Sequence, residues 1–487
     1  MAYPGRFGQK ERLLHKELSR NWRQRKCRII LGDKMSTEQS QYDKMMNTPI
    51  PKLIAGLAVP TILTMMVTNV YNVVDTAFVG QLGTSASGAI GVVFGFMSIL
   101  QAIGFTFGQG SGSIISRLLG TKDIERAGKV ASTAFFMAFF MAVLAGILCF
   151  ICLDDLVYAL GSTSTIAPYA KTYIIFILAT SPFMVTSFTL NNILRYEGRA
   201  NLGMIGMMSG ALLNIAGDAI FMFGMHMGIA GAGLSTAISQ VVGFCILIGA
   251  FLSGRTQCKL RISLVMWNIG EIWEIIATGM PSLLRQGLNS ITTIMLNTQA
   301  AVYGDAAVAG MSIVSRLFFF VFSVAIGVGQ SFQPVSGFSY GAKQYDRLKS
   351  AYKVTWLMAQ GLMLVLGTLM YIFAPTFVGW LRDDPEVIVV GTRALRLQCV
   401  ALLFLPLCMV TEMLMQSTGQ KLVASILSSL RNGILFIPCL YILAYVRGLA
   451  GIEEAQPLAY VLAFGPSVYF AKRFFSRLGG TADKTSG

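Results

Sequence analysis

Charged residues are scarce in this chain. Only 13% of its 487 residues are Asp, Glu, Lys or Arg, whereas 54% are hydrophobic. Soluble domains carry about 25% charged residues, so the composition excludes an ordinary soluble protein. Histidine is scarcer still, because His15 and His226 are the only two. Neither has a nucleophile or a metal-binding residue at a useful spacing in the sequence.

Motifs of enzymes and ATP-driven pumps are also missing. No GxxxxGK[S/T] phosphate-binding loop occurs, which argues against ATP drive by this chain. The eight cysteines are scattered, and only Cys149 and Cys152 form a CxxC, inside an apolar run. We therefore interpret them as buried packing residues, with a metal or redox role for the CxxC pair as the alternative. We expect no enzyme activity, no catalytic residues, no structural metal and no cofactor.

Apolar runs of about 20 or more residues recur along most of the chain. At 1.5 Å per helical residue, each can cross a hydrocarbon core about 30 Å thick. We therefore expect an all-α membrane protein with twelve spans in the lipid bilayer. The predicted spans are residues 53–79, 88–116, 128–153, 168–193, 201–224, 229–252, 271–302, 306–336, 351–375, 388–416, 421–446 and 456–475.

Lys and Arg are concentrated in alternate loops, the pattern that identifies cytoplasmic loops. It predicts that both termini are cytoplasmic, with tails at residues 1–52 and 476–487. The formal net charge of +15 then reflects topology, and we expect no nucleic-acid partner. The segment from Met35 reads as a natural start. Residues 1–34 are accordingly expected to be a flexible extension or a start-site artefact rather than a folded domain.

The chain repeats itself after 221 residues. Six spans in each copy place both halves in the membrane in the same direction, related by an axis along the membrane normal. We predict two six-helix lobes, residues 53–252 and 271–475, joined by a cytoplasmic linker at 253–270, with a substrate path between them. Equivalent pairs include Pro60 and Pro281, Gln109 and Gln330, Gly120 and Gly341, and Lys122 and Lys343.

Asp75 is the only carboxylate in the first span, and a lone ionisable group at membrane depth is costly unless it faces partners or water. Counting along straight helices places Asp75 about 33 Å, Asn214 about 20 Å and Asp218 about 26 Å from the cytoplasmic ends of their spans. Thr236 lies about 10 Å below the outer surface. Four oxygen-bearing side chains in the outer half of the first lobe predict a site for a proton or a small hard cation.

The second copy of the repeat lacks these groups. An architectural need would affect both copies alike, so the asymmetry favours a function. The alternative is that Asp75 and Asp218 merely hydrogen-bond to neighbouring helices. We favour it less, because buried acids cost more than packed apolar residues. The second-copy equivalents of Asp75, Asn214 and Asp218 are Leu296, Leu435 and Cys439.

The second lobe has charges of its own. Glu412 lies near the cytoplasmic end of its predicted span, and Arg285 lies within span seven. A structural ion pair is the interpretation that we favour, with contact to substrate as the alternative. Asn72 and Asn191 are further candidates for a substrate cavity.

Five segments together resemble one family, the multidrug and toxic compound extrusion (MATE) transporters, in the bacterial drug-exporter branch. The resemblance covers about residues 45–475. It implies a bacterial plasma-membrane protein in which Asp75, Asn214, Asp218 and Thr236 match the first-lobe cation site. The segments are VVDTAFVGQLG, GQGSGSIISRLLGTKDIERA, LRYEGRAN, LNIAGDAIFMFG and GIAGAGLSTAISQ. Some sodium-coupled members carry an acid where this chain has Asn289, so coupling through the second lobe is not expected.

These features predict a secondary active exporter. Influx of H⁺ or Na⁺ would drive extrusion of amphipathic or cationic small molecules by alternating access, with Pro60 and Pro281 as hinges, in a monomeric protein. One alternative is a flippase for lipid-linked saccharides, which should have a strongly basic cavity and extra spans. Another is a membrane-embedded transferase or hydrolase, which should cluster His, Asp or Cys at one membrane face.

Overall fold

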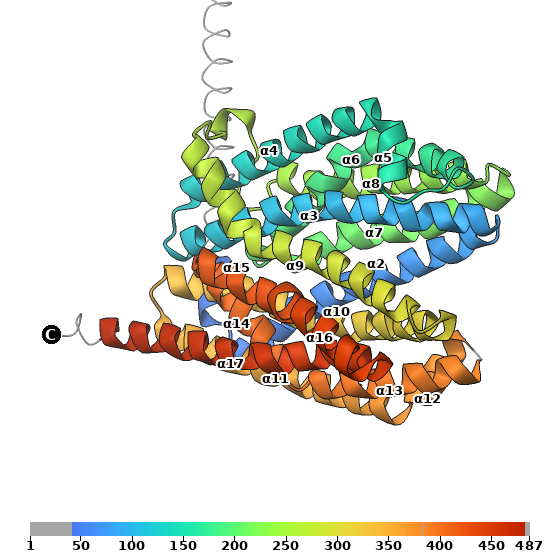
Figure 1. Cartoon of the computed structure of the whole chain (residues 1–487). Helices are drawn as coiled ribbons and strands as arrows, with labels where there is room; N and C mark the ends of the chain where they lie inside the picture. Colours follow the sequence, from blue (N-terminus) through green and yellow to red (C-terminus); the bar gives the residue numbers. More distant parts are fainter. Residues whose placement is uncertain (1–40, 383, 483–487) are drawn as a thin grey trace, which may run out of the picture. The chain divides into compact units, whose positions relative to one another are not determined.

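The computed structural model describes residues 41–382 and 384–482, and most of these residues are helical (Figure 1). Residues 41–47 form a helical stretch in a unit separate from residues 49–487. The predicted extension at residues 1–34 lies outside the described part of the chain.

Six spans form the first lobe, coloured blue to green in Figure 1. Asp123 begins the third of them as its N-cap, since its carboxylate accepts a hydrogen bond from the backbone N–H of Arg126 at 3.1 Å. The fifth span ends in a π-helical turn, η1. The elements are α2 (Ile50–Gly80), α3 (Thr84–Gly120), α4 (Ile124–Ile151) with the short α5 (Leu153–Ala159), α6 (Ala167–Tyr196), α7 (Ala200–Asp218) with η1 (Ala219–Gly224), and α8 (Ile229–Leu252).

Six further spans form the second lobe, coloured yellow to red. The eleventh span of the chain also contains a π-helical segment, η3. The elements are α9 (Ile269–Ala301), α10 (Asp305–Gly341), α11 (Tyr345–Ile372) with α12 (Ala374–Leu381), α13 (Pro385–Ala401) with α14 (Leu405–Ser417), α15 (Lys421–Ser429) with η3 (Leu430–Ile434) and α16 (Phe436–Arg447), and α17 (Leu449–Ala482).

The twelve-helix architecture is confirmed, and one span differs in shape from the prediction. Among the described residues, nine helices are long and apolar enough to cross a membrane, and the pair α13 and α14 makes a tenth that is bent by 52°. Pro406 lies in the first turn of α14, and a proline cannot continue the hydrogen bonding of the preceding helix. Helices α9 and α17, with 33 and 34 residues, complete the twelve.

The repeat is visible in the backbone conformation. Gly83 and Gly304 both have positive φ angles, 115° and 96°, which a residue without a Cβ adopts readily. Lys122 and Lys343 are also left-handed, with φ of 64° and 56°. Such angles are uncommon for lysine, so their recurrence 221 residues apart shows that both copies use the same turns.

The lobes contact each other mainly through the first two spans of each copy, because α3 contacts α9 and α10, and α10 contacts α2. We call the membrane side that carries the connection between the lobes the linker end. Residues 102–120 of α3 and 321–339 of α10, which lie toward that end, are almost all buried. Residues 84–101 and 306–320 are more exposed. The central helices therefore pack most closely toward the linker end.

The connection between the lobes is bound to the first lobe. The buried carboxylate of Glu197, in the turn after α6, accepts hydrogen bonds from the backbone N–H groups of Gln257 at 3.0 Å and Cys258 at 2.9 Å. On α4, the hydroxyl of Ser132 donates to the carbonyl of Lys259 at 2.9 Å. The connection, residues 253–268, is thus hydrogen-bonded to the first lobe, and we call it the strap.

We predict that Glu197→Ala releases this strap. The change removes the carboxylate to which two buried backbone N–H groups donate, and each lost bond of this kind costs about 1–3 kcal/mol. Trypsin should then cleave after Arg255, Lys259 or Arg261 about tenfold faster or more, because cleavage requires local opening. The exposed Glu125→Ala on α4 is the matched control and should cleave at the wild-type rate. Equal rates for all three proteins would contradict the prediction.

The pH dependence of stability should also report on Glu197. Burial raises the pKa of its carboxyl above the ordinary 4.5, against the opposing effect of the hydrogen bonds from Cys258 and Gln257. The folded chain therefore keeps the proton at pH values where the unfolded chain has lost it. Its contribution is most favourable below pH 4.5 and declines as pH rises through the raised pKa.

Glu197→Gln removes this titration. The melting temperature of the wild type, minus that of the variant, should fall as pH increases above about 4.5. Thermal unfolding of both proteins in detergent checks this. Parallel melting curves across the pH range would show that Glu197 does not titrate as expected.

Candidate functional site

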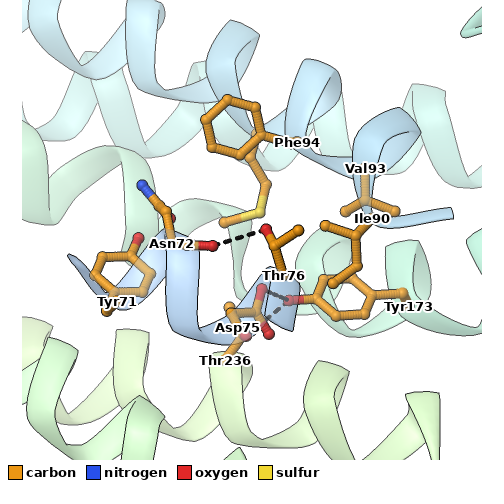
Figure 2. A pocket seen from close by; sticks show the side chains of 10 residues that line it. Tyr71, Asn72, Asp75, Thr76, Ile90, Val93, Phe94, Tyr173 and Thr236 are labelled. Atoms are coloured by element: carbon orange, nitrogen blue, oxygen red, sulfur yellow. Dashed lines mark hydrogen bonds between the residues drawn. The ribbon is translucent and has the colours of Figure 1, made fainter. Parts of the chain in front are cut away.

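The candidate site is built around Asp75, toward the end of α2 that lies opposite the linker end. Tyr71 and Asn72 precede Asp75 by one helical turn and so share its face of the helix. Figure 2 shows these side chains around a small cavity between α2, α3, α6 and α8. Its volume is about 10 Å³, roughly the room that one water molecule needs. Ile90 and Val93 of α3 form part of its apolar side.

Tyr173 of α6 connects two of the predicted residues. Its hydroxyl lies 3.5 Å from Oδ2 of Asp75, to which it donates, and 2.9 Å from Oγ1 of Thr236. Figure 2 shows the hydroxyl between these two groups. Tyr173 is only 2% exposed. A buried phenol thus links α2 to α8 through α6.

Asn214 and Asp218 lie on one face of α7, four residues apart. The amide of Asn214 donates to Oγ1 of Thr236 at 3.1 Å and to Oδ1 of Asp218 at 3.5 Å. Asp218 is fully buried and interacts electrostatically with Asp75. It is the last residue of α7 before η1, and π-helical turns often occur at functional sites.

Three oxygen atoms of this cluster have no hydrogen-bond donor. They are Oδ1 of Asp75, Oδ1 of Asn214 and Oδ2 of Asp218, and all three are buried. Buried acceptors without donors are costly, and carboxylate and amide oxygens are ligands for hard cations. These three oxygen ligands therefore suit a proton or a small cation such as Na⁺. No group of three or more His, Cys, Asp or Glu residues that could hold a metal ion occurs among the described residues.

The structure brings together the four residues that the sequence nominated, namely Asp75, Asn214, Asp218 and Thr236. Sequence reasoning missed Tyr173. Depth counting could have found it, because Tyr173 lies six residues into α6 and Thr236 lies seven residues into α8, and both helices begin at the same membrane side.

The second-lobe charges form a separate cluster. Glu412 of α14 lies 2.7 Å from Nη1 of Arg285 on α9 and 3.7 Å from Nη2 of Arg431 in η3. Arg431 also lies over the rings of Phe322 and Tyr460. All three charged side chains are at least nine-tenths buried, so one carboxylate is shared by two guanidinium groups.

The remaining candidates lie in different surroundings. Asn72 lines the first-lobe cavity, whereas Asn191 of α6 lies against Gly203 of α7. Pro60 and Pro281 lie inside α2 and α9, which are unbroken at these positions. Each proline removes one helical hydrogen bond, so both sites are weakened without being kinked into separate helices.

Comparison with known proteins identifies the same two copies. The MatE family model matches residues 60–220 and 281–442, more than half of the chain. The chain is 26% identical over 450 residues to "Multidrug export protein MepA" of Staphylococcus haemolyticus, covering 92% of this chain and 97% of that protein. It is 27% identical over 419 residues to the protein of that name from Staphylococcus aureus, covering 86% and 92%.

Solved structures agree. "Outward-facing conformation of a multidrug resistance MATE family transporter of the MOP superfamily" is similar with a TM-score of 0.85 at 25% identity, covering 90% of this chain and 98% of that one. A MATE structure described as "in the bent conformation" gives the same TM-score and identity, covering 91% and 99%. With its two matched repeats and its twelve helices, this chain belongs to the MatE family, the multidrug and toxic compound extrusion transporters.

Proposed function

We propose that this chain exports amphipathic or cationic small molecules in exchange for H⁺ or Na⁺. The observation that carries the coupling proposal is the set of three buried oxygens without donors on Asp75, Asn214 and Asp218. Export is supported by the family and by relatives that are named multidrug export proteins. The unit of transport is a single chain in the bacterial plasma membrane.

The linker end is proposed to face the cytoplasm. It carries basic residues in several loops, among them Lys122, Arg199, Lys259 and Lys343, and basic loops stay on the cytoplasmic side. Both chain termini then lie in the cytoplasm. The Asp75 cluster lies toward the opposite, external side, from which the coupling ion would enter.

Coupling requires that the ion and the substrate prefer different conformations. Asp75 lies on α2, and the same helix packs against α10 and α11 of the second lobe. The amide of Asn69 donates to the hydroxyl of Ser323 on α10 at 2.8 Å, and Ile62 packs against Gly327. Neutralising Asp75 changes the charge and the hydrogen bonds that hold α2 in the first lobe. Pro60 removes one helical hydrogen bond, so α2 can bend at that position.

Asp75→Asn should abolish ion-driven efflux. The amide cannot bind or release a proton, and it supplies one oxygen where the carboxylate supplies two. Efflux of ethidium from proteoliposomes, measured under an imposed pH gradient and separately under a Na⁺ gradient, checks this. Drive by only one gradient identifies the coupling ion.

Asp155→Asn is the control for this experiment, because Asp155 is an exposed carboxylate outside the cluster. It should transport at the wild-type rate. If Asp75→Asn matched it under both gradients, coupling through the first lobe would be wrong.

Tyr173→Phe should weaken coupling without abolishing it. The phenyl ring keeps the packing of α6, but Asp75 and Thr236 lose the hydroxyl that links them. Losing one hydrogen bond to a charged group, worth about 1.5–3 kcal/mol, should change the half-saturating concentration of the coupling ion about tenfold or more. The maximal rate should change less. An unaltered half-saturation would remove Tyr173 from the site.

A further inference from the structure

Two equivalent glycines lie where α3 crosses α10. A Cβ on Gly120 would overlap the backbone carbonyl of Phe338, and a Cβ on Gly341 would overlap that of Arg117. Phe338 and Arg117 are themselves 221 residues apart. The contact is therefore reciprocal: the same surface of each repeat meets its counterpart, and only glycine lets the two backbones approach so closely.

The same approach occurs between α3 and α9. A Cβ on Gly110 would overlap the carbonyl of Ile275, and one on Gly279 would overlap the carbonyl of Thr106. All four glycines lie in the half of the helices toward the linker end. The two lobes are thus in backbone contact on this side.

Two equivalent glutamines join the lobes beside these crossings. Oε1 of Gln109, on α3, accepts hydrogen bonds from Nη2 of Arg285 at 3.2 Å and from Oγ of Ser282 at 2.6 Å, both on α9. Oε1 of Gln330, on α10, accepts from Nη1 of Arg195 on α6. Each glutamine therefore holds an arginine of the opposite lobe, and all of these side chains are buried.

Both arginines also have a partner within their own lobe. Arg285 pairs with Glu412, and Arg195 donates to Oδ1 of Asn192. Separation of the lobes would break the bonds to the glutamines and leave each guanidinium with its own-lobe partner. Breaking a bond to a neutral amide costs far less than stranding a buried charge. The cross-lobe bonds are thus the ones that can open and close.

We propose that the paired glycine crossing and the two glutamine–arginine bonds form the cytoplasmic gate of the transport cycle, closed in the state described here. The gate contains two arms, Gln109 with Arg285 and Gln330 with Arg195, together with the crossing of α3 and α10 at Gly120 and Gly341. The two glutamines are equivalent in the repeat, whereas the two arginines come from different spans of their lobes. This rests on the proposed function for its orientation. An interface that stays closed throughout the cycle is the competing interpretation.

The experiment measures the distance across the linker end directly. Spin labels are placed at Glu125 and Asp346, which are exposed and equivalent positions at the starts of α4 and α11. Pulsed electron–electron double resonance measures the distance between the two labels. The full chain is placed in lipid nanodiscs, with its native cysteines replaced and its efflux verified. A longer distance marks the open gate.

Gly120→Ala should increase the long-distance population about tenfold, because the added methyl group cannot fit against Phe338 in the closed state. Gly95→Ala is the matched control, since Gly95 is on the same helix with nothing within 4 Å of its Cβ position. It should match the wild type. If Gly120→Ala also matched the wild type, the crossing would not be a gate.

Substitutions of the two glutamines should shift the distance between the labels in opposite directions. Gln109→Leu combined with Gln330→Leu should favour the open distance about tenfold or more, since two bonds to charged groups are lost. Gln330→Glu should favour the closed distance, because a carboxylate binds Arg195 more strongly than an amide does. Misfolding cannot produce this opposite shift, and an unchanged distribution in both variants would overturn the proposal.

The measurement is independent of transport. A shift with Gly120→Ala, together with normal ion-driven efflux by Asp75→Asn, would leave the gate standing and remove the coupling site. Loss of efflux by Asp75→Asn with no shift in any gate variant would do the reverse.

Discussion

The cost of burying polar groups among apolar helices determines most of this structure. Asp75, Asn214 and Asp218 can remain in the first lobe because hydroxyl and amide groups from α6, α7 and α8 meet them there. Even so, three oxygens stay without donors. A cluster that is nearly, but not fully, satisfied gains most from a small cation or a proton, which is the property that a coupling site needs.

The two lobes solve the same problem with different residues. The second copy replaces the acids of the first by Leu296, Leu435 and Cys439, and Leu296 is packed in its apolar core. Three of its own buried charges, Arg285, Glu412 and Arg431, lie elsewhere and form one cluster. Among the described residues, one lobe therefore keeps two carboxylates without a cationic side chain beside them, while the other holds an ionic cluster that anchors the arginine reaching toward Gln109.

Much of this could be predicted from the sequence, because hydrophobic runs determine spans and a helical rise converts residue number to depth. That reasoning located the spans and the four residues around Asp75. It could not find the bend between α13 and α14, because the apolar residues continue on both sides of Pro406. The bonds of Gln109 and Gln330 were also beyond reach, since they depend on how each helix is rotated about its axis, which depth does not specify.

The reciprocal contact of Gly120 with Phe338 and of Gly341 with Arg117 has the geometry of a two-fold homodimer interface. A six-span ancestor that paired through this surface would have carried every substitution twice. In this chain, where residues 253–268 join the copies, a substitution occurs in one half only. One half can therefore hold carboxylates at the end opposite the linker while the other holds arginines, an asymmetry that a symmetric homodimer cannot have.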